Sequence, residues 1–283
     1  MKDTWYGKYA EVYGKPYSDE YKGIAEGIKA KILKMQSSSP VATLVVISYN
    51  EGENLLSCLW ALSNLVCDKY PIEIIGVDND SQDNSVQIFK DCGIEPYIVK
   101  DYHTCGATRQ KGLDIARGKY FFCIDGDTLY PPLYVQTMVE RMENDPAIAA
   151  VGTYWDFLPD PSYSRFELRL YEFFRDCHLF FQEIKRPELA IRGMTMAFVT
   201  ELGRKFGFRV DLMRVDDGTL ILNLKTVGKI KFFHSKNTTV VTGTRTILQE
   251  GSLFKAFMSR VKLHLKNSYE YFSSANHYED KEK

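Results

Sequence analysis

The feature that most constrains the fold is a series of short apolar runs separated by segments of helical character. The runs cover residues 43–48, 72–77, 96–99, 120–124 and 147–153, and the helical segments between them end near 65 or span 83–91, 106–117 and 131–143. Short runs rich in β-branched residues are typical of strands buried on both faces. Strands that alternate with helices form right-handed βαβ units. The sequence therefore predicts an α/β fold with a mainly parallel sheet flanked by helices, followed by a mixed region after about residue 154.

Polar clusters follow three of the predicted strands. They are Tyr49-Asn50-Glu51, Asp78-Asn79-Asp80 and Asp125-Gly126-Asp127. In open α/β sheets, ligands bind at the carboxyl ends of the strands. Because these ends lie along one edge of a parallel sheet, the clusters predict a binding site at that edge.

The same pattern divides the chain into three parts. The first part is polar and charged, with a predicted helix over 19–35, and we interpret it as an N-terminal extension and linker rather than catalytic apparatus. The last part is predicted to hold an amphipathic helix and a polar tail. The predicted division is 1–40, then a single domain over 41–245 (halves 41–153 and 154–245), then 246–283.

Composition narrows the classes of function. A formal net charge of −1 gives no overall attraction to nucleic acid. The six cysteines form no CxxC pair, which argues against a zinc knuckle and a dense disulfide framework and favours a reducing, cytoplasmic location. No stretch approaches the about 18 apolar residues of a membrane span, and residues 1–40 lack the apolar core of a secretory signal. We expect a protein that is soluble or peripheral on the inner face of the membrane.

The Asp125-Gly126-Asp127 sequence is the strongest single chemical signal. Two carboxylates separated by one small residue, directly after a buried strand, can share a hard divalent cation such as Mg²⁺ or Mn²⁺. The alternative is a polar turn in which the glycine takes a positive φ and an aspartate caps the next helix. The position of the motif after the apolar run 121–124 favours the metal interpretation.

Four motifs in order give the chain a family resemblance. Val45–Glu51 and Ile74–Asp83, then Ala107–Gly112 with Ala116–Tyr120, precede Asp125-Gly126-Asp127. This arrangement resembles family 2 glycosyltransferases; the resemblance covers roughly 42–245, and four ordered motifs are far more specific than one. The resemblance implies a GT-A fold with a Rossmann-like sheet.

The resemblance also implies a site for a nucleotide diphosphate sugar, with a UDP-linked donor favoured. Tyr49 would flank the base, and Asp78 and Asn79 would contact it, although many members carry an acid where Asn79 stands. Asp125 would lie near the ribose, and Arg109 would reach the base or the diphosphate. The implied donor-binding set is Ser48, Tyr49, Asn50, Glu51, Asp78, Asn79, Arg109, Asp125, Gly126, Asp127 and Arg245.

The implied cofactor is a divalent cation, Mn²⁺ or Mg²⁺, held by Asp127 with Asp125. Such a cation would neutralise charge on the departing diphosphate. His234 is a further candidate ligand, because some GT-A enzymes recruit a distal histidine. A lone histidine near a strand end is more often structural.

The second half is expected to supply the acceptor side, with Arg192, Gly193 and Met194 similar to the acceptor segment of the family. Asp216 and Asp217 match an acidic pair that opens a helix, and Asp217 would be the general base with Asp216 its neighbour. An ordinary helix N-cap is the alternative. Thr219 departs from the pattern, since an acid is frequent there.

Two further stretches combine aromatic and charged residues. Residues 164–185 are expected to pack as a core or interface helix. Residues 253–266 place apolar side chains at helical spacing with basic residues on other faces and no acid. That pattern is compatible with peripheral contact with an anionic membrane, but it favours an amphipathic helix docked on its own domain with a solvated basic face.

The resemblance implies an inverting glycosyltransferase, and we expect it to act on a glycan or lipid-linked acceptor in glycan or polysaccharide assembly. One alternative is a catalytically inactive nucleotide-sugar-binding protein on the same fold. A second is a sugar nucleotidyltransferase, which would normally carry a Gly-rich basic loop where residues 49–53 are acidic. The absence of GxGxxG and Walker A sequences argues against dinucleotide oxidoreductases and P-loop enzymes.

Overall fold

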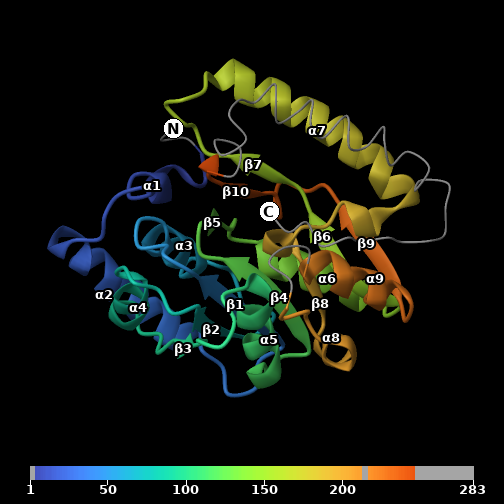
Figure 1. Ribbon diagram of the computed structural model, residues 1–283, viewed down its shortest axis with the longest axis horizontal. Helices are drawn as coiled ribbons and strands as arrows, with labels where there is room; N and C mark the ends of the chain where they lie inside the picture. The colour runs from blue at the N-terminus through green and yellow to red at the C-terminus, as the bar shows by residue number, and fades with distance from the viewer. Residues whose placement is uncertain (1–3, 212–215, 246–283) are drawn as a thin grey trace.

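The computed structural model describes residues 4–211 and 216–245, in which two sheets carry the fold (Figure 1). The larger has the strand order β3-β2-β1-β4-β8-β6-β9. Its strands are β1 (Ala42–Ser48), β2 (Ile72–Asp78), β3 (Tyr97–Ile98), β4 (Tyr120–Asp125), β6 (Ile148–Thr153), β8 (Ala197–Val199) and β9 (Lys229–Phe233). All five predicted apolar runs are strands of this sheet.

Strand β1 lies at the centre of the parallel half of the sheet. Leu44 pairs with Ile74 of β2 on one side and with Phe122 of β4 on the other, both in parallel register. Strand β8 runs antiparallel between β4 and β6, and β6 pairs with β9 in parallel. The sheet is therefore mainly parallel with one reversed strand, and the predicted α/β fold class is confirmed.

Helices pack on the sheet in the order expected of βαβ units. The helices are α1 (Gly7–Ala10), α2 (Lys22–Met35), α3 (Leu55–Leu62), α4 (Ser85–Asp91), α5 (Cys105–Ile115), α6 (Tyr134–Asn144), α7 (Arg165–Lys185), α8 (Thr200–Phe206) and α9 (Asp216–Lys225), with short 3₁₀ turns at Asp19–Tyr21, Pro187–Leu189 and Gly193–Thr195. Helices α2, α3 and α4 contact one another, and α5 contacts β1, β2, α8 and α9.

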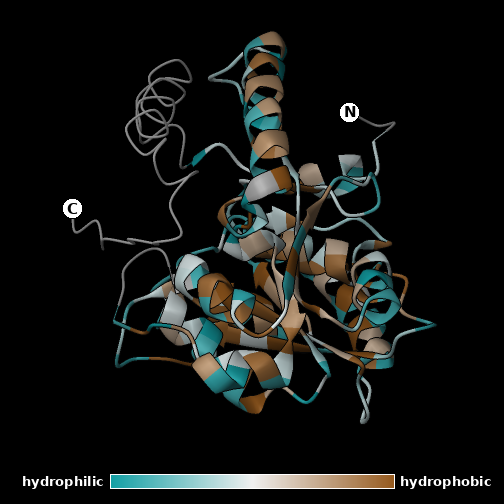
Figure 2. Ribbon diagram, turned by 90° about the vertical axis from the view of Figure 1, so that its right-hand side faces the viewer, coloured by the Kyte–Doolittle hydropathy of each residue, from teal (hydrophilic) through white to brown (hydrophobic). Residues whose placement is uncertain are grey.

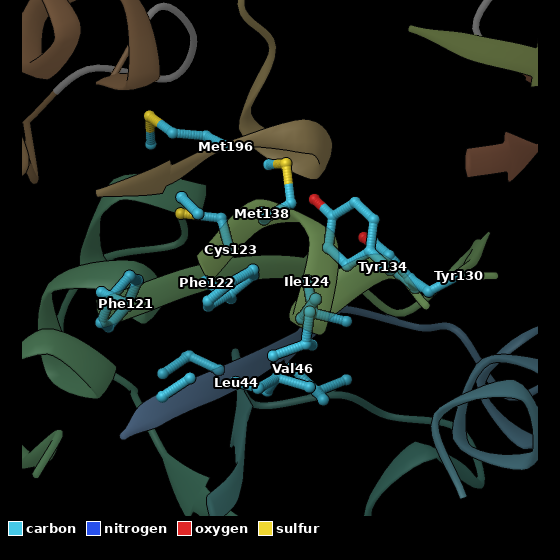
Figure 3. Close-up of a cluster of buried hydrophobic side chains, with 14 of the residues drawn as sticks. Leu44, Val46, Phe121, Phe122, Cys123, Ile124, Tyr130, Tyr134, Met138 and Met196 are labelled. Atoms are coloured by element: carbon cyan, nitrogen blue, oxygen red, sulfur yellow. The ribbon is translucent and has the colours of Figure 1, made fainter. Parts of the chain in front are cut away.

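The core explains why the central strands β1 and β4 are rich in apolar residues. Leu44 and Val46 of β1 are fully buried, and so are Phe121 and Phe122 of β4, whose side chains point to opposite faces of the sheet. Figure 3 shows the cluster around them, with Tyr134 and Met138 contributed by α6. Full burial of a side chain of this size stabilises the fold by about 1.5–3 kcal/mol.

Gly112 lets helix α5 approach β1 closely. A Cβ at this position would lie 2.3 Å from Cγ1 of Val45, closer than two carbon atoms can come. The close approach fixes α5 against the sheet. Arg109, one turn earlier on the same helix, is thereby held near the carboxyl end of β4.

A second, small sheet brings the segment around β10 close to the carboxyl end of β4. It consists of β5 (Thr128–Leu129), β10 (Val240–Thr242) and β7 (Trp155–Phe157). Thr242 pairs with Thr128, directly after Asp127. Residues 243–245 therefore lie beside the Asp125–Asp127 turn although more than 100 residues of sequence separate them.

The N-terminal segment, predicted as an extension, packs onto this domain. Ile28 and Ile32 of α2 are buried in the same apolar cluster as β1 and β4. Tyr9 packs edge-on against Trp60 of α3 at 5.5 Å between ring centroids. Tyr13 and the residues around it thereby lie beside the carboxyl ends of the strands.

The predicted C-terminal helix over 253–266, with its membrane contact, lies outside the described residues, as does the rest of 246–283. Within the part of the chain that the structure describes, no helix combines the length and apolar character required to cross a membrane.

Candidate active site

The residues predicted at the strand ends lie on one edge of the sheet. Ser48, the last residue of β1, pairs with Asp78, the last residue of β2, and Ile47 pairs with Asp125 at the end of β4. Gly126 turns the chain immediately over β1, where a Cβ would lie 3.0 Å from the carbonyl oxygen of Ile47. The parallel register thus brings the three polar clusters together.

Asp78 is fully buried and organises the first two loops. Its carboxylate accepts hydrogen bonds from Ser48 Oγ (2.5 Å), Ser81 N–H (2.8 Å) and Ser81 Oγ (2.7 Å). A carboxylate offers about four lone-pair positions, so capacity for one further donor remains. A base N–H is a donor of the kind that this position can accept.

The loop after β1 is held in an unusual backbone conformation. Asn50 has a φ of 52°, in the left-handed region that asparagine tolerates better than most residues. Its N–H donates to Ser81 Oγ (2.8 Å), and its Oδ1 accepts from Gln82 N–H (2.9 Å). Tyr49 next to it is 52% exposed, 6.3 Å from the ring of His103, so its ring is open to a planar ligand.

Asn79 has partners within the protein that the sequence did not indicate. With its amide oriented to satisfy both neighbours, Nδ2 donates to the carbonyl of Tyr102 (2.9 Å) and Oδ1 accepts from Thr104 N–H (3.2 Å). The side chain is buried and ties the loop after β2 to the loop before α5. Its contact with a base stays a prediction.

Arg109 links the donor-side and acceptor-side segments. Its guanidinium is buried and Nη2 lies 2.9 Å from Oδ1 of Asp125. The same nitrogen would lie 2.3 Å from a Cβ at position 193. Only glycine fits at position 193 while Arg109 keeps this place.

Gly193 also contacts Asp217. The Gly193 N–H donates to Asp217 Oδ2 (2.6 Å), and the Gly218 N–H donates to Oδ1 of the same carboxylate (2.8 Å). Asp217 lies in the first turn of α9, partly exposed, with both oxygens oriented by backbone groups. Asp216 is the first residue of this helix, and its side chain lies outside the description.

The other acceptor-side residues surround the same turn. Arg192 donates through Nη1 to the carbonyls of Leu189 (2.9 Å) and Ile191 (3.0 Å), and its guanidinium lies over the ring of Trp155 at 5.8 Å. The carbonyl of Met194 accepts from Tyr130 Oη (3.0 Å). The exposed Arg192 guanidinium is therefore held by the backbone carbonyls that precede Gly193.

A second ion cluster joins Glu51, Asp127 and Arg245. Nη2 of Arg245 lies 3.2 Å from Oδ2 of Asp127 and also pairs with Oε1 of Glu51. Burial and the neighbouring Glu51 carboxylate raise the pKa of the Asp127 carboxyl, while Arg245 opposes the rise. Two acids are thus close enough to destabilise each other, and one cation lies between them.

This donor set fits a divalent cation. Asp127 supplies a carboxylate that repulsion from Glu51 makes less stable, which a bound cation relieves. Among the residues described, no three His, Cys, Asp or Glu side chains gather into a complete metal site. Such a set suits a cation that takes one or two carboxylates from the protein and further oxygens from phosphates.

His234 lies in a different environment from the predicted metal ligands Asp125 and Asp127. Its ring meets that of Tyr154 edge-on at 5.1 Å, and its charge interacts with Asp156 and Glu183. These partners belong to β7, α7 and the chain between β6 and β7. The contacts do not bring His234 to the Asp125–Asp127 turn, and its role as a ligand stays a prediction.

Tyr13 is a site residue that the sequence did not indicate. Its Oη donates to the backbone carbonyl of Asp127 (2.8 Å) and lies 2.6 Å from where a Cβ at Gly243 would be. Burial, then the charges of Asp127 and Glu51, raises the pKa of the Tyr13 hydroxyl well above its usual value. The hydroxyl therefore stays protonated and remains a donor to the turn.

Comparison with known proteins decides the family. The sequence profile described as Glycosyl transferase family 2 matches residues 43–199, just over half of the chain. The chain belongs to glycosyl transferase family 2. A curated relative, the uncharacterized glycosyltransferase YibD of Escherichia coli, is 29% identical over 128 residues, 44% of this chain and 37% of that protein. The matched region spans about a third of the length of such curated relatives.

Solved structures confirm the GT-A fold. TarS of S. aureus (residues 1–349), crystallised with UDP-GlcNAc, matches with a TM-score of 0.55 and 13% identity over 71% of this chain and 58% of that one. Glucosyl-3-phosphoglycerate synthase from Mycobacterium tuberculosis, in complex with Mn²⁺, UDP-glucose and phosphoglyceric acid, matches with a TM-score of 0.54 and 18% identity over 84% and 81%. The family 2 prediction is confirmed.

Proposed function

We propose that this protein transfers a sugar from a nucleotide diphosphate sugar, UDP-linked in the favoured case, to an acceptor hydroxyl with inversion at the anomeric carbon. The observation that carries the proposal is the position of Gly193. It contacts the Arg109–Asp125 pair on one side and the Asp217 carboxylate on the other. A donor held at the strand ends and an acceptor held at Asp217 would therefore meet at this residue.

The donor would bind across the strand ends. Tyr49 offers an exposed ring to the base, and Asp78, which already orders the loops beside it, would accept a base N–H. Asp125, fixed by Arg109, would accept from the ribose hydroxyls. The UDP-sugars in the two solved structures support a UDP-linked donor here.

The diphosphate would lie against Asp127, Glu51 and Arg245. When Mn²⁺ or Mg²⁺ is bound, Asp127 would hold it, and the cation supplies positive charge to the phosphate oxygens of the leaving group. Arg245 would turn from the two carboxylates toward the diphosphate as the cation replaces it. A guanidinium pairs well with phosphate oxygens, so Arg245 keeps a partner in both states.

Asp217 would act as the general base. Its carboxylate takes the proton of the acceptor hydroxyl as that oxygen forms a bond to the anomeric carbon, and the bond from this carbon to the diphosphate oxygen breaks. Attack opposite the leaving group inverts the configuration. The N–H groups of Gly193 and Gly218 fix the carboxylate in place for this step.

The proposed acceptor is a glycan or a lipid-linked saccharide, with a role in glycan or polysaccharide assembly. Arg192, which is exposed and directly precedes Gly193, would lie nearest to the acceptor and donate to its hydroxyls.

Product analysis tests the proposal. The full chain is incubated with UDP- and GDP-linked sugars and Mn²⁺, with and without saccharide acceptors, and nucleoside diphosphate and the glycosylated product are measured. The proposal predicts nucleoside diphosphate release that rises with an acceptor and stops with a chelator. Binding without release would favour an inactive binding protein, and pyrophosphate formed from a nucleoside triphosphate and a sugar 1-phosphate would favour a nucleotidyltransferase.

A further inference from the structure

Helix α7 has an apolar outer face that the proposed reaction does not use. Phe166, Leu170, Phe173, Cys177, Phe180 and Ile184 follow one another at steps of four and three residues, and Phe174 and Phe181 lie beside them. Phe166 is 74% exposed, Phe181 67% and Ile184 65%. Figure 2 shows the helix standing away from the body of the molecule with hydrophobic residues along its length. We call these eight residues the outer stripe.

The opposite face of α7 accounts for its attachment to the domain. Leu168, Tyr171, Arg175 and Leu179 are buried, and Arg175 lies 4.8 Å from the ring of Trp155. A capping box between Ser164 and Glu167 fixes the start of the helix. The outer stripe therefore lies on the face of α7 that is turned away from the domain.

The spacing of the outer stripe is that of a helix–helix seam. Alternating steps of four and three residues keep side chains on one face of a helix that packs along another. Monomeric proteins rarely leave so many large apolar side chains exposed side by side. We propose that the outer stripe is the docking face for residues 254–272 of this same chain.

The sequence of the segment matches the stripe. Phe254, Met258, Val261, Leu265, Ser268 and Phe272 repeat the same 4-3-4-3-4 steps as Phe166 to Ile184. All but Ser268 are apolar, as a seam requires. The two patterns therefore fit each other over the full length of α7, about 31 Å at 1.5 Å per residue.

The position of residue 245, where the described part of the chain stops, favours residues 254–272 as the occupant of the outer stripe. Thr244 Oγ1 bonds to Asp160, and Leu158 N–H donates to the carbonyl of Thr242 (2.8 Å), so residue 245 lies close to the start of α7. The nine steps from 245 to 254 span up to about 30 Å when extended. A segment that begins there would run parallel to α7, with Leu265 level with Cys177.

Tethering favours this occupant over a second copy of the protein. A segment joined by a short linker has an effective concentration in the millimolar range, far above that of a second copy at micromolar protein. Docking would also fix the chain just after Arg245, which pairs with Glu51 and Asp127. The outer stripe would thus help to keep Arg245 at the active site.

Cys177, exposed in the middle of the stripe, reports on the docking. Alkylation of the full chain by a maleimide is followed at each cysteine by mass spectrometry. We expect Cys177 to react about tenfold more slowly in the wild type than in a Val261→Asp/Leu265→Asp variant. Cys105, the other exposed thiol, is the internal control and should react equally in both. Ser259→Asp adds one negative charge off the seam and should leave the alkylation of Cys177 slow.

A disulfide test keeps the proposal independent of the folding of that variant. Mild oxidation of Leu265→Cys should give an intramolecular bond to Cys177, and Ser259→Cys should not. Equal alkylation of Cys177 in all variants would overturn the proposal. So would protection that depends on protein concentration, which indicates a second copy, or protection that requires phosphatidylglycerol vesicles, which indicates a lipid surface.

Discussion

Gly193 shows how a single residue can join the two halves of the site. Because Gly193 has no side chain, the Arg109 guanidinium fits directly beside it. Its N–H donates a hydrogen bond to Asp217. From the sequence, Gly193 is predicted only as part of the acceptor segment with Arg192 and Met194. Nothing in the local sequence says that a residue of α5, more than 80 positions earlier, would fill the space beside it, because that contact depends on how β8 pairs with β4.

Substitution of this glycine tests the junction. In Gly193→Ala the new Cβ would lie 2.3 Å from Arg109 Nη2, so the guanidinium must leave Asp125. Overpacking of this kind costs about 1–3 kcal/mol, and we expect kcat/KM for transfer to fall about tenfold to a hundredfold. Gly23→Ala, on α2 with open space around its Cβ, is the matched control and should keep full activity. Full activity in Gly193→Ala would show that the contacts of Gly193 with Arg109 and Asp217 are not needed for transfer.

Burial, and after it the Glu51 carboxylate, shifts the pKa of Asp127 upward. Its carboxyl therefore gains a proton, and loses its affinity for a cation, at a higher pH than an ordinary aspartate. Folding therefore favours the protonated form of Asp127, and this contribution to stability is lost as pH rises through its folded pKa.

In Glu51→Gln, which removes this charge, we expect the acid limb of the kcat/KM profile, measured at saturating Mn²⁺, to move to lower pH. Glu53→Gln makes the same change at an exposed neighbour and should leave the limb in place. An unmoved limb in Glu51→Gln would show that another group controls it.

Among the elements, those with a recognisable local pattern were predicted correctly, and those defined by distant pairing were not. Strands β1, β2, β4 and β6 and helices α2 and α5 follow directly from the sequence. The three-residue strands β7, β8 and β10 carry too few residues to show a period, and their pairing is decided by partners far along the chain. The position of Arg245 beside Asp127 depends on the pairing of β10. The sequence therefore indicated Arg245 as a site residue but not its ion pairs with Glu51 and Asp127.

For a similar reason, the sequence did not predict that the N-terminal segment contributes to the site. Its polar, Tyr-rich sequence has no periodic apolar pattern before residue 19, and an isolated hydrogen bond such as that from Tyr13 to the Asp127 carbonyl leaves no signature in sequence. The structure packs α1 against α3 and brings Tyr13 to the turn.

Removal of the Tyr13 hydroxyl tests this contribution. Tyr13→Phe loses a hydrogen bond worth about 1 kcal/mol, so we expect binding of UDP in the presence of Mn²⁺ to weaken several-fold by calorimetry. Tyr17→Phe loses a comparable bond, to Asp91 (2.7 Å), away from the site. Tyr17→Phe should lower the melting temperature about as much as Tyr13→Phe does, while its affinity for UDP stays that of the wild type. Equal affinities in both variants would make Tyr13 purely structural.

At the scale of the whole molecule, the fold divides the proposed chemistry between its two halves. The parallel half carries the donor residues at the ends of β1, β2 and β4, and the mixed half carries Asp217 and Arg192. Both halves share one continuous sheet, which keeps them in fixed register. Helix α7 belongs to the mixed half and leaves the body on the side where the small sheet lies (Figure 1).

In the proposed reaction, Asp127 serves the donor and Asp217 serves the acceptor. Calorimetric titration of UDP and Mn²⁺ into Asp217→Asn and Asp127→Asn tests it directly. We predict that Asp217→Asn binds as tightly as the wild type while its transfer falls by about 10²–10⁴, and that Asp127→Asn loses the Mn²⁺-dependent binding. Lost donor affinity in Asp217→Asn, or unchanged Mn²⁺-dependent binding in Asp127→Asn, would contradict the account.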